Sequence, residues 1–574
     1  MCGIFALLNS DNYHTDIITS EFIKGKNRGP EFSKLDKKFM KMVLGFHRLA
    51  INGLNEKSNQ PLVINDVVLV CNGEIYNYKQ LYKDMGVTPI TDSDCEVIIH
   101  MYLKYGIEQT LTMLDGVYAF VLFDNRLTEN LNNKIYVARD PFGVRPLYYL
   151  KKKRDINRLS NLIGFASELK CLEYFYNSNS ENFLLEQFKP GTYSVYNLSN
   201  KVQSIWELER ENISYFIPTF SHNWFINGEI EATFLDNLSV KISSYLHAAV
   251  NKRCLTTERP IACLLSGGLD SSLIASLVNN FYTSHSLPNK LETYSIGLEG
   301  SDDLKYASVV ANYLGTNHTE IIVTEQEMFD AIPSVIQAIE SYDTTTVRAS
   351  IGNYLLGKYI SQHSEAKVIF NGDGSDELFG GYLYMNKCPD DIEFDRETRR
   401  LLKDIHLFDV LRSDKSISSH GLEPRTPFLD RNFVNFILSI PPFFRNHTTY
   451  VDPDYGCAEK FILRYSFLDR FFIDSRGKQI IPDEILWRTK EAFSDGVSTH
   501  GRSLYKILQE NIAKTMSNNE KIYEANIDTE KEYYKQIFLS YYPNCENVLP
   551  YYWMPKYTTS TDPSARTLDI YKIN

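Results

Sequence analysis

A serine- and glycine-rich segment, Leu264 to Ser272 (LLSGGLDSS), most constrains how this 574-residue chain can fold. It joins an apolar run at 260–265, typical of a buried strand, to a helical pattern at 271–279. Paired glycines leave room for a ligand beside the backbone, and a helix N-terminus suits an anion. Asp270 would repel a phosphate unless a cation such as Mg²⁺ lay between them. The segment therefore predicts a metal–nucleotide site, and a serine-glycine turn between core elements is the plainer alternative.

Composition narrows the classes of partner. The formal net charge is −12 and no basic tract stands out, which argues against nucleic acid. No apolar run reaches the roughly 18 residues of a membrane helix, and the N-terminus lacks a secretory signal, so we expect no membrane contact and a cytoplasmic location. The nine cysteines contain no C-x-x-C pair, which argues against a disulfide framework and a structural zinc site.

The second residue is a cysteine, and the apolar run at 4–8 that follows Gly3 predicts a buried strand. If Met1 is removed, Cys2 carries a free α-amine with a pKa of about 8. That amine can act as the general base for its own thiol, as in N-terminal nucleophile enzymes. A chance cysteine at position 2 is the alternative.

Three further clusters in the first half suit the chemistry of a small amino acid. Arg48 ends a strand-like run and can hold a carboxylate with two hydrogen bonds. Asn72 and Gly73 follow another β-rich run and offer donors for an oxyanion. Asp94 opens a helix, where it serves either as a cap or as a ligand for an ammonium group.

These clusters resemble a class II glutamine amidotransferase domain. The motifs that carry the likeness, in order, are Cys2-Gly3-Ile4, Arg28-Gly29-Pro30, His47-Arg48-Leu49, Asn72 to Asn77 and Arg139 to Leu147. The family implies an N-terminal nucleophile fold, an αββα sandwich, with Cys2 as nucleophile and Asn72 and Gly73 as the oxyanion hole. Glutamine would be bound by Arg48, Leu49, Ala50, Ile51, Asn52, Asn72, Gly73, Glu74 and Asp94. The family usually has His and Asp where this chain has Asn27 and Glu31, and we expect a structural effect only.

Apolar runs and helical patterns alternate in the second half. Strands are expected at 291–297, 319–323 and 368–370, with a helix marked by apolar residues from 304 to 314. This alternation predicts a doubly wound parallel sheet with helices on both faces. Ser266, Gly297 and Gly372 would then lie at carboxyl ends of strands, where such sheets bind ligands.

Three more segments of the second half carry polar groups. Asn371 to Glu377 places three carboxylates within five residues, and these need a cation nearby; the spacing does not match a calcium-binding loop. Tyr342 to Ser350 combines hydroxyls with Arg348, which suits an anionic amino acid. Lys490 lies among aromatic and turn residues, where a solvated lysine is the default interpretation.

The segment 266–272 resembles the pyrophosphate-binding loop of N-type ATP pyrophosphatases. Together with 423–430 and the tail at 552–566, the motifs resemble the glutamine-hydrolysing asparagine synthetases in their eukaryote-like form. The family implies that ATP activates aspartate as β-aspartyl-AMP, releasing pyrophosphate, and that ammonia from glutamine then displaces AMP. The implied ATP ligands are Leu264, Ser266, Gly267, Gly268, Asp270, Ser271, Ser272, Ile296, Asn371 and Gly372. Thr345, Thr346 and Arg348 would bind aspartate, Asp270 and Asp376 would hold Mg²⁺, and Asp373 and Lys490 would be catalytic.

Two positions depart from that family. Asp373 stands where the family generally has Glu, the carboxylate thought to take a proton from ammonia. It is one methylene shorter, and a misplacement of about 1 Å can cost roughly a hundredfold in rate. We expect Asp373 to function nevertheless. Asn371 replaces a usual Ser, and a backbone contact to the nucleotide would be unaffected.

The expected organisation is an amidotransferase domain at 2–205, a linker at 206–232 and a synthetase domain at 233–574. The expected partners are glutamine, aspartate and ATP, and a homodimer is left open. Competing interpretations are a glutaminase with a degenerate synthetase domain, a ligase with another acceptor, as in β-lactam synthetases, and a non-enzymatic interaction protein.

Overall fold

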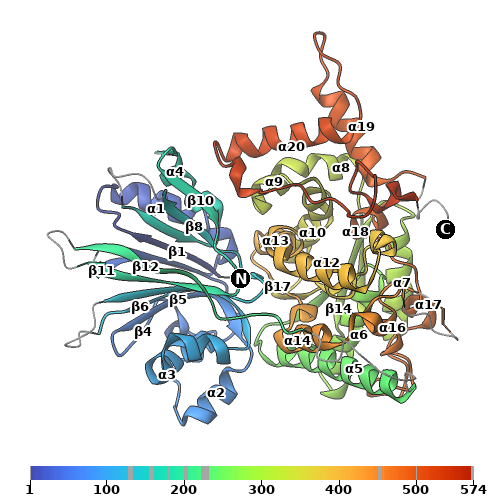
Figure 1. Cartoon of the computed structure of the whole chain (residues 1–574), viewed down its shortest axis with the longest axis horizontal. Helices are drawn as coiled ribbons and strands as arrows, with labels where there is room; N and C mark the ends of the chain where they lie inside the picture. Colours follow the sequence, from blue (N-terminus) through green and yellow to red (C-terminus); the bar gives the residue numbers. More distant parts are fainter. Residues whose placement is uncertain are drawn as a thin grey trace.

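The computed structural model describes residues 2–39, 41–126, 133–153, 161–178, 180–199, 204–220, 232–449, 455–456, 458–499 and 501–569. A β-rich N-terminal lobe packs against a larger lobe in which helices surround a sheet (Figure 1). Met1 and residues 221–231 of the expected linker lie outside the described residues. Among the described helices, none is long and apolar enough to cross a membrane.

The N-terminal lobe contains two stacked antiparallel sheets, with orders β10-β8-β9-β1-β3-β2 and β12-β11-β7-β6-β5-β4. The strands are β1 Gly3–Leu8, β2 Phe32–Phe39, β3 Met42–Arg48, β4 Leu62–Ile64, β5 Val67–Ile75, β6 Gly116–Asp124, β7 Lys134–Arg139, β8 Tyr148–Lys152, β9 Ile163–Ala166, β10 Phe183–Gln187, β11 Thr192–Ser199 and β12 Ile205–Ser214. Helices α1 Thr15–Ile23 and α4 Glu173–Asn177 cover one sheet, and α2 Tyr78–Met85 and α3 Val97–Met113 cover the other (Figure 1). The predicted αββα sandwich is confirmed.

Strand β1 is buried on both faces, as its apolar run predicts. Ile4, Ala6 and Leu8 belong to the core between the sheets, whereas Phe5 and Leu7 pack in the core beneath α1. Because successive side chains of a strand point to opposite faces, a strand covered on both sides has no polar alternation. The packing therefore fixes Cys2, directly before β1, at the end of a rigid element.

A five-stranded parallel sheet, β15-β14-β13-β16-β17, forms the centre of the second lobe. Its strands are β13 Ile261–Leu264, β14 Glu292–Gly297, β15 Asn317–Ile322, β16 Val368–Phe370 and β17 Glu423–Arg425. The first four match the sequence-based expectation, and their carboxyl ends bring the serine-glycine loop and Asn371 to one edge. Strand β17 adds an unpredicted edge that faces the first lobe (Figure 1).

Helices fill the remainder of the second lobe. They are α5 Ala232–Leu255, α6 Leu269–Ser284, α7 Asp302–Leu314, α8 Glu325–Asp330, α9 Ile332–Ile339, α10 Thr344–His363, α11 Ser375–Phe379, α12 Asp391–Asp404, α13 Asp409–Ser418, α14 Arg431–Ser439, α15 Pro442–Arg445, α16 Phe461–Tyr465, α17 Asp483–Leu486, α18 Phe493–Gly496, α19 Leu504–Met516 and α20 Ile527–Tyr541.

Strand β12 lies within the segment expected as a linker and pairs with β11. We therefore propose that the first domain extends through Ser214.

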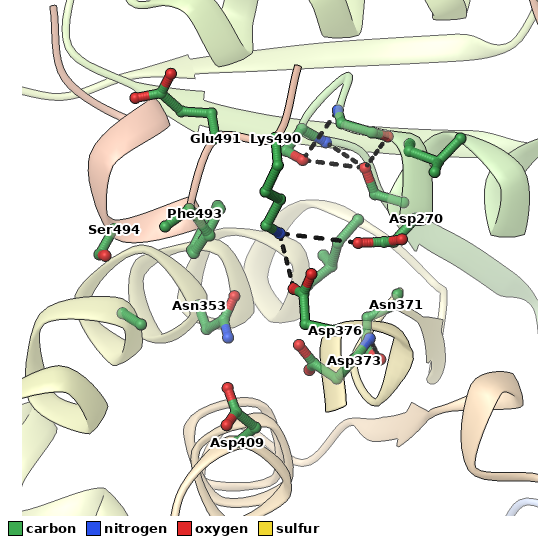
Figure 2. A pocket seen from close by; sticks show the side chains of 18 of the residues that line it. Asp270, Asn353, Asn371, Asp373, Asp376, Asp409, Lys490, Glu491, Phe493 and Ser494 are labelled. Carbon is green, nitrogen blue, oxygen red and sulfur yellow. Dashed lines mark hydrogen bonds and ion pairs between the residues drawn. The ribbon is translucent and has the colours of Figure 1, made fainter. Parts of the chain in front are cut away.

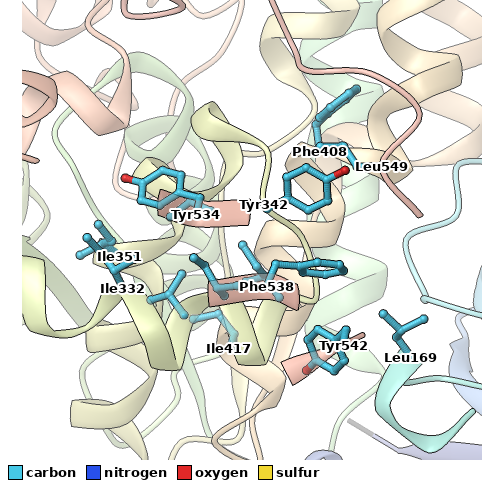
Figure 3. Packing of buried hydrophobic residues seen from close by; sticks show 14 of the residues in the cluster. Leu169, Ile332, Tyr342, Ile351, Phe408, Ile417, Tyr534, Phe538, Tyr542 and Leu549 are labelled. Carbon is cyan, nitrogen blue, oxygen red and sulfur yellow. The ribbon is translucent and has the colours of Figure 1, made fainter. Parts of the chain in front are cut away.

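The two lobes share an apolar core. Leu169 of the first lobe belongs to the same buried cluster as Ile417, Phe538 and Tyr542 of the second. Figure 3 shows Leu169 beside Tyr542, which directly follows α20. Burial of this surface favours association of the lobes, because apolar contact area leaves water.

Buried charges are paired across the same interface. The Arg28 Nη1 atom lies 2.9 Å from Glu168 and 2.7 Å from Asp414 of the second lobe. The Lys415 ammonium contacts both Glu168, at 3.3 Å, and Glu340. Each charge taken out of water here has an opposite charge beside it, as a buried ion requires.

We predict that Lys415→Met destabilises the chain by about 3–5 kcal/mol, because it removes the buried cation nearest to the Glu340 carboxylate, whereas Glu168 keeps Arg28. The apparent Tm should fall relative to wild type. Lys358→Met, at an exposed position on α10, is the matched control and should leave Tm unchanged. An unchanged Tm for Lys415→Met would contradict the prediction.

Candidate active sites

The first candidate site surrounds Cys2. Its thiol lies 3.6 Å from the Leu49 carbonyl oxygen, and Arg28 Nε donates to the Cys2 carbonyl at 3.0 Å. Burial raises the pKa of the Cys2 thiol to about 11, despite the opposing effect of a nearby amino terminus. A thiol with this pKa is protonated at neutral pH, so nucleophilic attack needs a base.

Asn72 and Gly73 lie on β5 beside the start of β1. Asn72 Nδ2 lies 3.4 Å from the Ser167 hydroxyl, which also accepts from Ile4 N at 3.0 Å. Asn72 Oδ1 is buried with no hydrogen-bond partner among the described residues. A side chain at Gly73 would overlap the Val117 backbone. Ser167 was not singled out from the sequence, because no local motif marks it.

The groups expected to hold glutamine surround the loop after β3. Arg48 donates to Asn55 O at 2.9 Å and to Asn59 Oδ1 at 2.6 Å, and Asn52 Nδ2 donates to Glu74 Oε2 at 2.7 Å. The Arg48 side chain therefore contacts its own loop, so a carboxylate ligand would have to replace some of these acceptors.

Two carboxylates are buried behind this loop. Asp94 accepts from Ile75 N at 2.7 Å, and burial raises the pKa of Asp94 to about 6. Burial, followed by the charge of Asp94, raises the pKa of Glu74 well above its usual range. Arg425 of β17 lies 3.6 Å from Glu74 and opposes this rise. A cationic ligand group would stabilise both carboxylates in their charged forms.

The second candidate site is a pocket at the carboxyl edge of the parallel sheet. The predicted residues that line it are Leu264, Ser266, Gly268, Asp270, Ser271, Ile296, Thr345, Thr346, Asn371, Gly372, Asp373, Asp376 and Lys490. Gly267, Ser272 and Arg348 are outside this lining. Gly267 has a φ of +70°, and a Cβ there would overlap the Tyr306 backbone, so the loop requires glycine.

The loop is fixed by its own hydroxyls and leads into a long helix. Ser266 Oγ and Ser271 Oγ lie 3.0 Å apart, and Ser266 N donates to Ser271 Oγ at 3.2 Å. Helix α6 begins at Leu269, so its first backbone N–H groups lie beside the pocket. This arrangement suits the binding of phosphate groups.

Acidic side chains and lysines form ion pairs in the pocket, and Figure 2 shows Lys490 directed at Asp270 and Asp376. Lys490 Nζ lies 2.7 Å from Asp376 Oδ2 and 3.8 Å from Asp270 Oδ2. Lys460 Nζ lies 2.6 Å from an oxygen of each of the same carboxylates. Burial opposes ionisation of Asp376, but the charges of Lys460 and Lys490 outweigh it and hold its pKa below the usual range.

The sequence analysis did not identify Lys460. It begins the short helix α16 in a segment without a recognisable motif, at a φ of +58°. Its side chain passes over Gly381, where a Cβ would overlap Lys460 Cε. A glycine opposite a buried lysine is a long-range relation, which no local pattern reveals.

Asp373 lies on another side of the pocket, near Asp409 (Figure 2). Arg412 Nη2 lies 3.1 Å from Asp373 and 2.7 Å from Asp409. Burial raises the pKa of Asp373, with Arg412 opposing and Asp409 adding to the rise. The neighbouring Asn371 donates to Ser413 Oγ at 2.5 Å. Arg412, which also pairs with Asp409 in α13, thus fixes the position of the Asp373 carboxylate.

Arg348 has its bonding partners inside the protein, and its expected contact with aspartate stays a prediction. Its guanidinium is buried and bonded to two carboxylates, Glu530 at 2.5 and 2.8 Å and Asp562 at 2.7 and 2.8 Å. These bonds use four of the five guanidinium N–H groups and join α10 to α20 and the C-terminal segment. Thr345 stays a candidate ligand of aspartate, since its buried hydroxyl has no hydrogen-bond partner among the described residues.

Fold and sites together define a two-domain ligase that couples a glutamine amidotransferase domain to an ATP-using domain. The glutamine amidotransferase domain model matches residues 1–209, and the asparagine synthase model matches 241–392 and 386–547. The chain is 41% identical to the asparagine synthetase [glutamine-hydrolyzing] of Gallus gallus over 588 residues, covering 100% of this chain and 99% of that protein. The Homo sapiens protein of the same name is 39% identical over 595 residues, with the same coverage. The chain belongs to the glutamine-hydrolysing asparagine synthetase family.

We predict that Gly381→Ala abolishes ATP-dependent amide synthesis, because the added Cβ displaces Lys460 from Asp270 and Asp376. Glutamine hydrolysis should persist. Gly501→Ala, which has open space around the added Cβ, is the matched control for a glycine substitution in the same lobe. Synthesis at the wild-type rate by Gly381→Ala would show that the Lys460 contact is dispensable.

Proposed function

We propose that Cys2 releases ammonia from glutamine in the first domain, and that the second domain uses it to convert activated aspartate into asparagine. The observation that carries this assignment is the occurrence of both groups of residues in one chain. A half-buried thiol directly precedes β1, where Ile4 and Asn72 share the Ser167 hydroxyl, and acids and lysines lie beside a glycine loop. The overall reaction consumes ATP, aspartate, glutamine and water. It forms AMP, pyrophosphate, asparagine and glutamate.

In the glutamine site, the Cys2 sulfur attacks the side-chain amide carbon. The carbon–nitrogen bond breaks, the nitrogen takes up the thiol proton through the base and leaves as ammonia, and a glutamyl thioester remains. Removal of Met1 supplies the base as the new α-amine of Cys2. Asn72 Nδ2 and the Gly73 backbone N–H stabilise the oxyanion. Arg48 holds the α-carboxylate, and Glu74 and Asp94 hold the amino group. Water then hydrolyses the thioester to glutamate.

In the pocket of the second domain, the side-chain carboxylate of aspartate attacks the α-phosphorus of ATP. The bond from that phosphorus to the bridging oxygen breaks, and pyrophosphate leaves. The serine-glycine loop holds the phosphates with backbone N–H groups, and Lys490 and Lys460 balance the charge of the leaving group. Thr345 and Thr346 hold aspartate.

Asp270 and Asp376 suit Mg²⁺, because both carboxylates are close enough to share one lysine ammonium and lie beside the phosphate loop. Mg²⁺ is commonly held by one or two carboxylates together with substrate phosphates. When bound, it would neutralise phosphate charge. The lysines then orient both acids and keep Asp376 ionised before nucleotide binds.

Ammonia attacks the carbonyl carbon of β-aspartyl-AMP, AMP leaves, and Asp373 accepts the proton. Arg412 and Asp409 orient Asp373 for this step. Ammonia must reach the pocket without meeting bulk water. Strand β17 lies between the two sites. The Arg425 side chain contacts Glu74 of the glutamine site, and the Arg425 carbonyl accepts from Asn371 N at 3.1 Å.

We further propose a cytoplasmic location, because ATP, glutamine and aspartate are metabolites of that compartment. A homodimer stays open. Cell fractionation and the mass of the purified protein in solution test these two points separately from the chemistry.

We predict that Cys2→Ala abolishes glutamine-supported asparagine formation and leaves ammonium-supported formation within about twofold of wild type, because only the thiol is removed. Amino-acid product analysis with ATP, aspartate and either nitrogen source measures this. Cys71→Ala, at a buried cysteine of β5, is the control. Equal loss with both nitrogen sources would contradict separate roles for the two sites.

We predict that Asp373→Asn lowers asparagine formation by roughly 10²–10⁴-fold, the usual contribution of a positioned proton acceptor. Asp373→Glu should retain activity, since it keeps a carboxylate. Aspartate-dependent pyrophosphate release should persist in both variants, because Asp373 acts after adenylation. If Asp373→Ala forms asparagine at the wild-type rate, Asp373 does not have this role.

A further inference from the structure

Residues 256–259, between α5 and β13, lie against the glutamine-site loop, residues 49–53 of the first domain. Four hydrogen bonds join the two segments: Asn52 Nδ2 to Thr256 O (3.1 Å), Glu258 N to Ile51 O (3.0 Å), Gly53 N to Glu258 Oε1 (2.8 Å) and Arg259 Nε to Ala50 O (2.8 Å). The loop is therefore bonded to the second domain at each residue from Ala50 to Gly53.

Glu31 completes this contact. Its Oε2 atom accepts from Ala50 N at 2.7 Å, and its Oε1 atom pairs with Arg259 Nη2 at 2.8 Å. Glu31 and Arg259 thus hold the backbone N–H and the carbonyl of Ala50 between them. Glu31 is one of the two positions of its motif that differ from the usual amidotransferase pattern, and its side chain spans the domain boundary.

The loop held in this way contacts the groups that act on glutamine. Leu49 O accepts from the Cys2 thiol at 3.6 Å, and Asn52 bonds to Glu74 at 2.7 Å. Arg48 donates to Asn52 O at 3.3 Å. Occupation of the glutamine site must therefore change contacts of this loop.

The other side of the contact leads directly to the phosphate loop. Strand β13 begins two residues after Arg259 and spans about 13 Å at 3.3 Å per residue, ending just before Ser266. Pro260 O accepts from Lys367 N at 3.1 Å and from Val368 N at 3.3 Å, so the start of this strand is fixed in the sheet. Strand β13 is hydrogen-bonded to β14 and β16, so it is more rigid than a free loop. A displacement of the Ala50 backbone would therefore displace this strand.

We propose that Glu31 and Arg259 are positioning residues that couple the glutamine site to the phosphate loop. This inference rests on the proposed function and adds a means of communication between its two sites. Because coupling between two binding events is reciprocal, nucleotide and aspartate bound in the second domain change the affinity of the first domain for glutamine. Neither residue contacts the pocket of the second domain.

The test compares glutamine hydrolysis with and without aspartate plus a non-hydrolysable ATP analogue, in wild type, Arg259→Gln, Glu31→Gln and Arg259→Lys. We expect ligands to change the KM for glutamine by about fivefold or more in wild type, and Arg259→Gln and Glu31→Gln to lose most of that change. Arg259→Lys, which keeps the charge, should be intermediate. Ammonium-supported synthesis should stay within about twofold of wild type in all variants.

Arg502→Gln is the matched control, since Arg502 forms a half-exposed ion pair with Glu325 inside the second domain. It should keep the wild-type response. The proposal is overturned if Arg259→Gln and Glu31→Gln keep the full ligand response, or if wild type shows none. Should Arg259→Gln fail to fold, Glu31→Gln decides the test. Absence of ammonium-supported synthesis in wild type would instead refute the proposed function.

Discussion

In the synthetase pocket, two half-buried carboxylates come together with lysine cations between them, and the pocket depends on that constraint. Asp270 and Asp376 each lie 2.6 Å from Lys460 Nζ. Without the lysines, burial would favour the protonated form of Asp376, because the charges of Lys460 and Lys490 hold its pKa below the usual range. The pocket is therefore organised before substrate arrives, which reduces the rearrangement required for catalysis.

The same constraint operates where the domains meet. Arg425 pairs with Glu423 at 2.9 Å inside the second domain and lies 3.6 Å from Glu74 of the first. Its carbonyl bonds to Asn371, which lines the nucleotide pocket. One three-residue strand thus completes the parallel sheet, neutralises carboxylates of the glutamine site and contacts the synthetase pocket. Contacts of this strand with both lobes, together with the apolar core and the ion pairs between the lobes, fix the relative placement of the two sites.

Local patterns were sufficient to predict most of the architecture. Strand β16 and the loop after β13 follow from apolar runs that end in glycine and polar residues, which are signals contained in the segment itself. The exceptions depend on distant partners. The two carboxylates that bond to Arg348 lie 182 and 214 residues away, so no local pattern indicates them. Lys460 was missed because its place depends on Gly381, and β17 is short and contains Pro424.

The paired charges between the lobes also bear on how the chain can be divided. If the chain were cut within 206–232 and the halves separated, Arg28 and Lys415 would each lose acidic neighbours, and Leu169 would face solvent. Water would solvate the ions, but the uncovered apolar surface would promote self-association. Covalent fusion of the two enzymatic halves therefore serves their assembly as much as the transfer of nitrogen from one to the other.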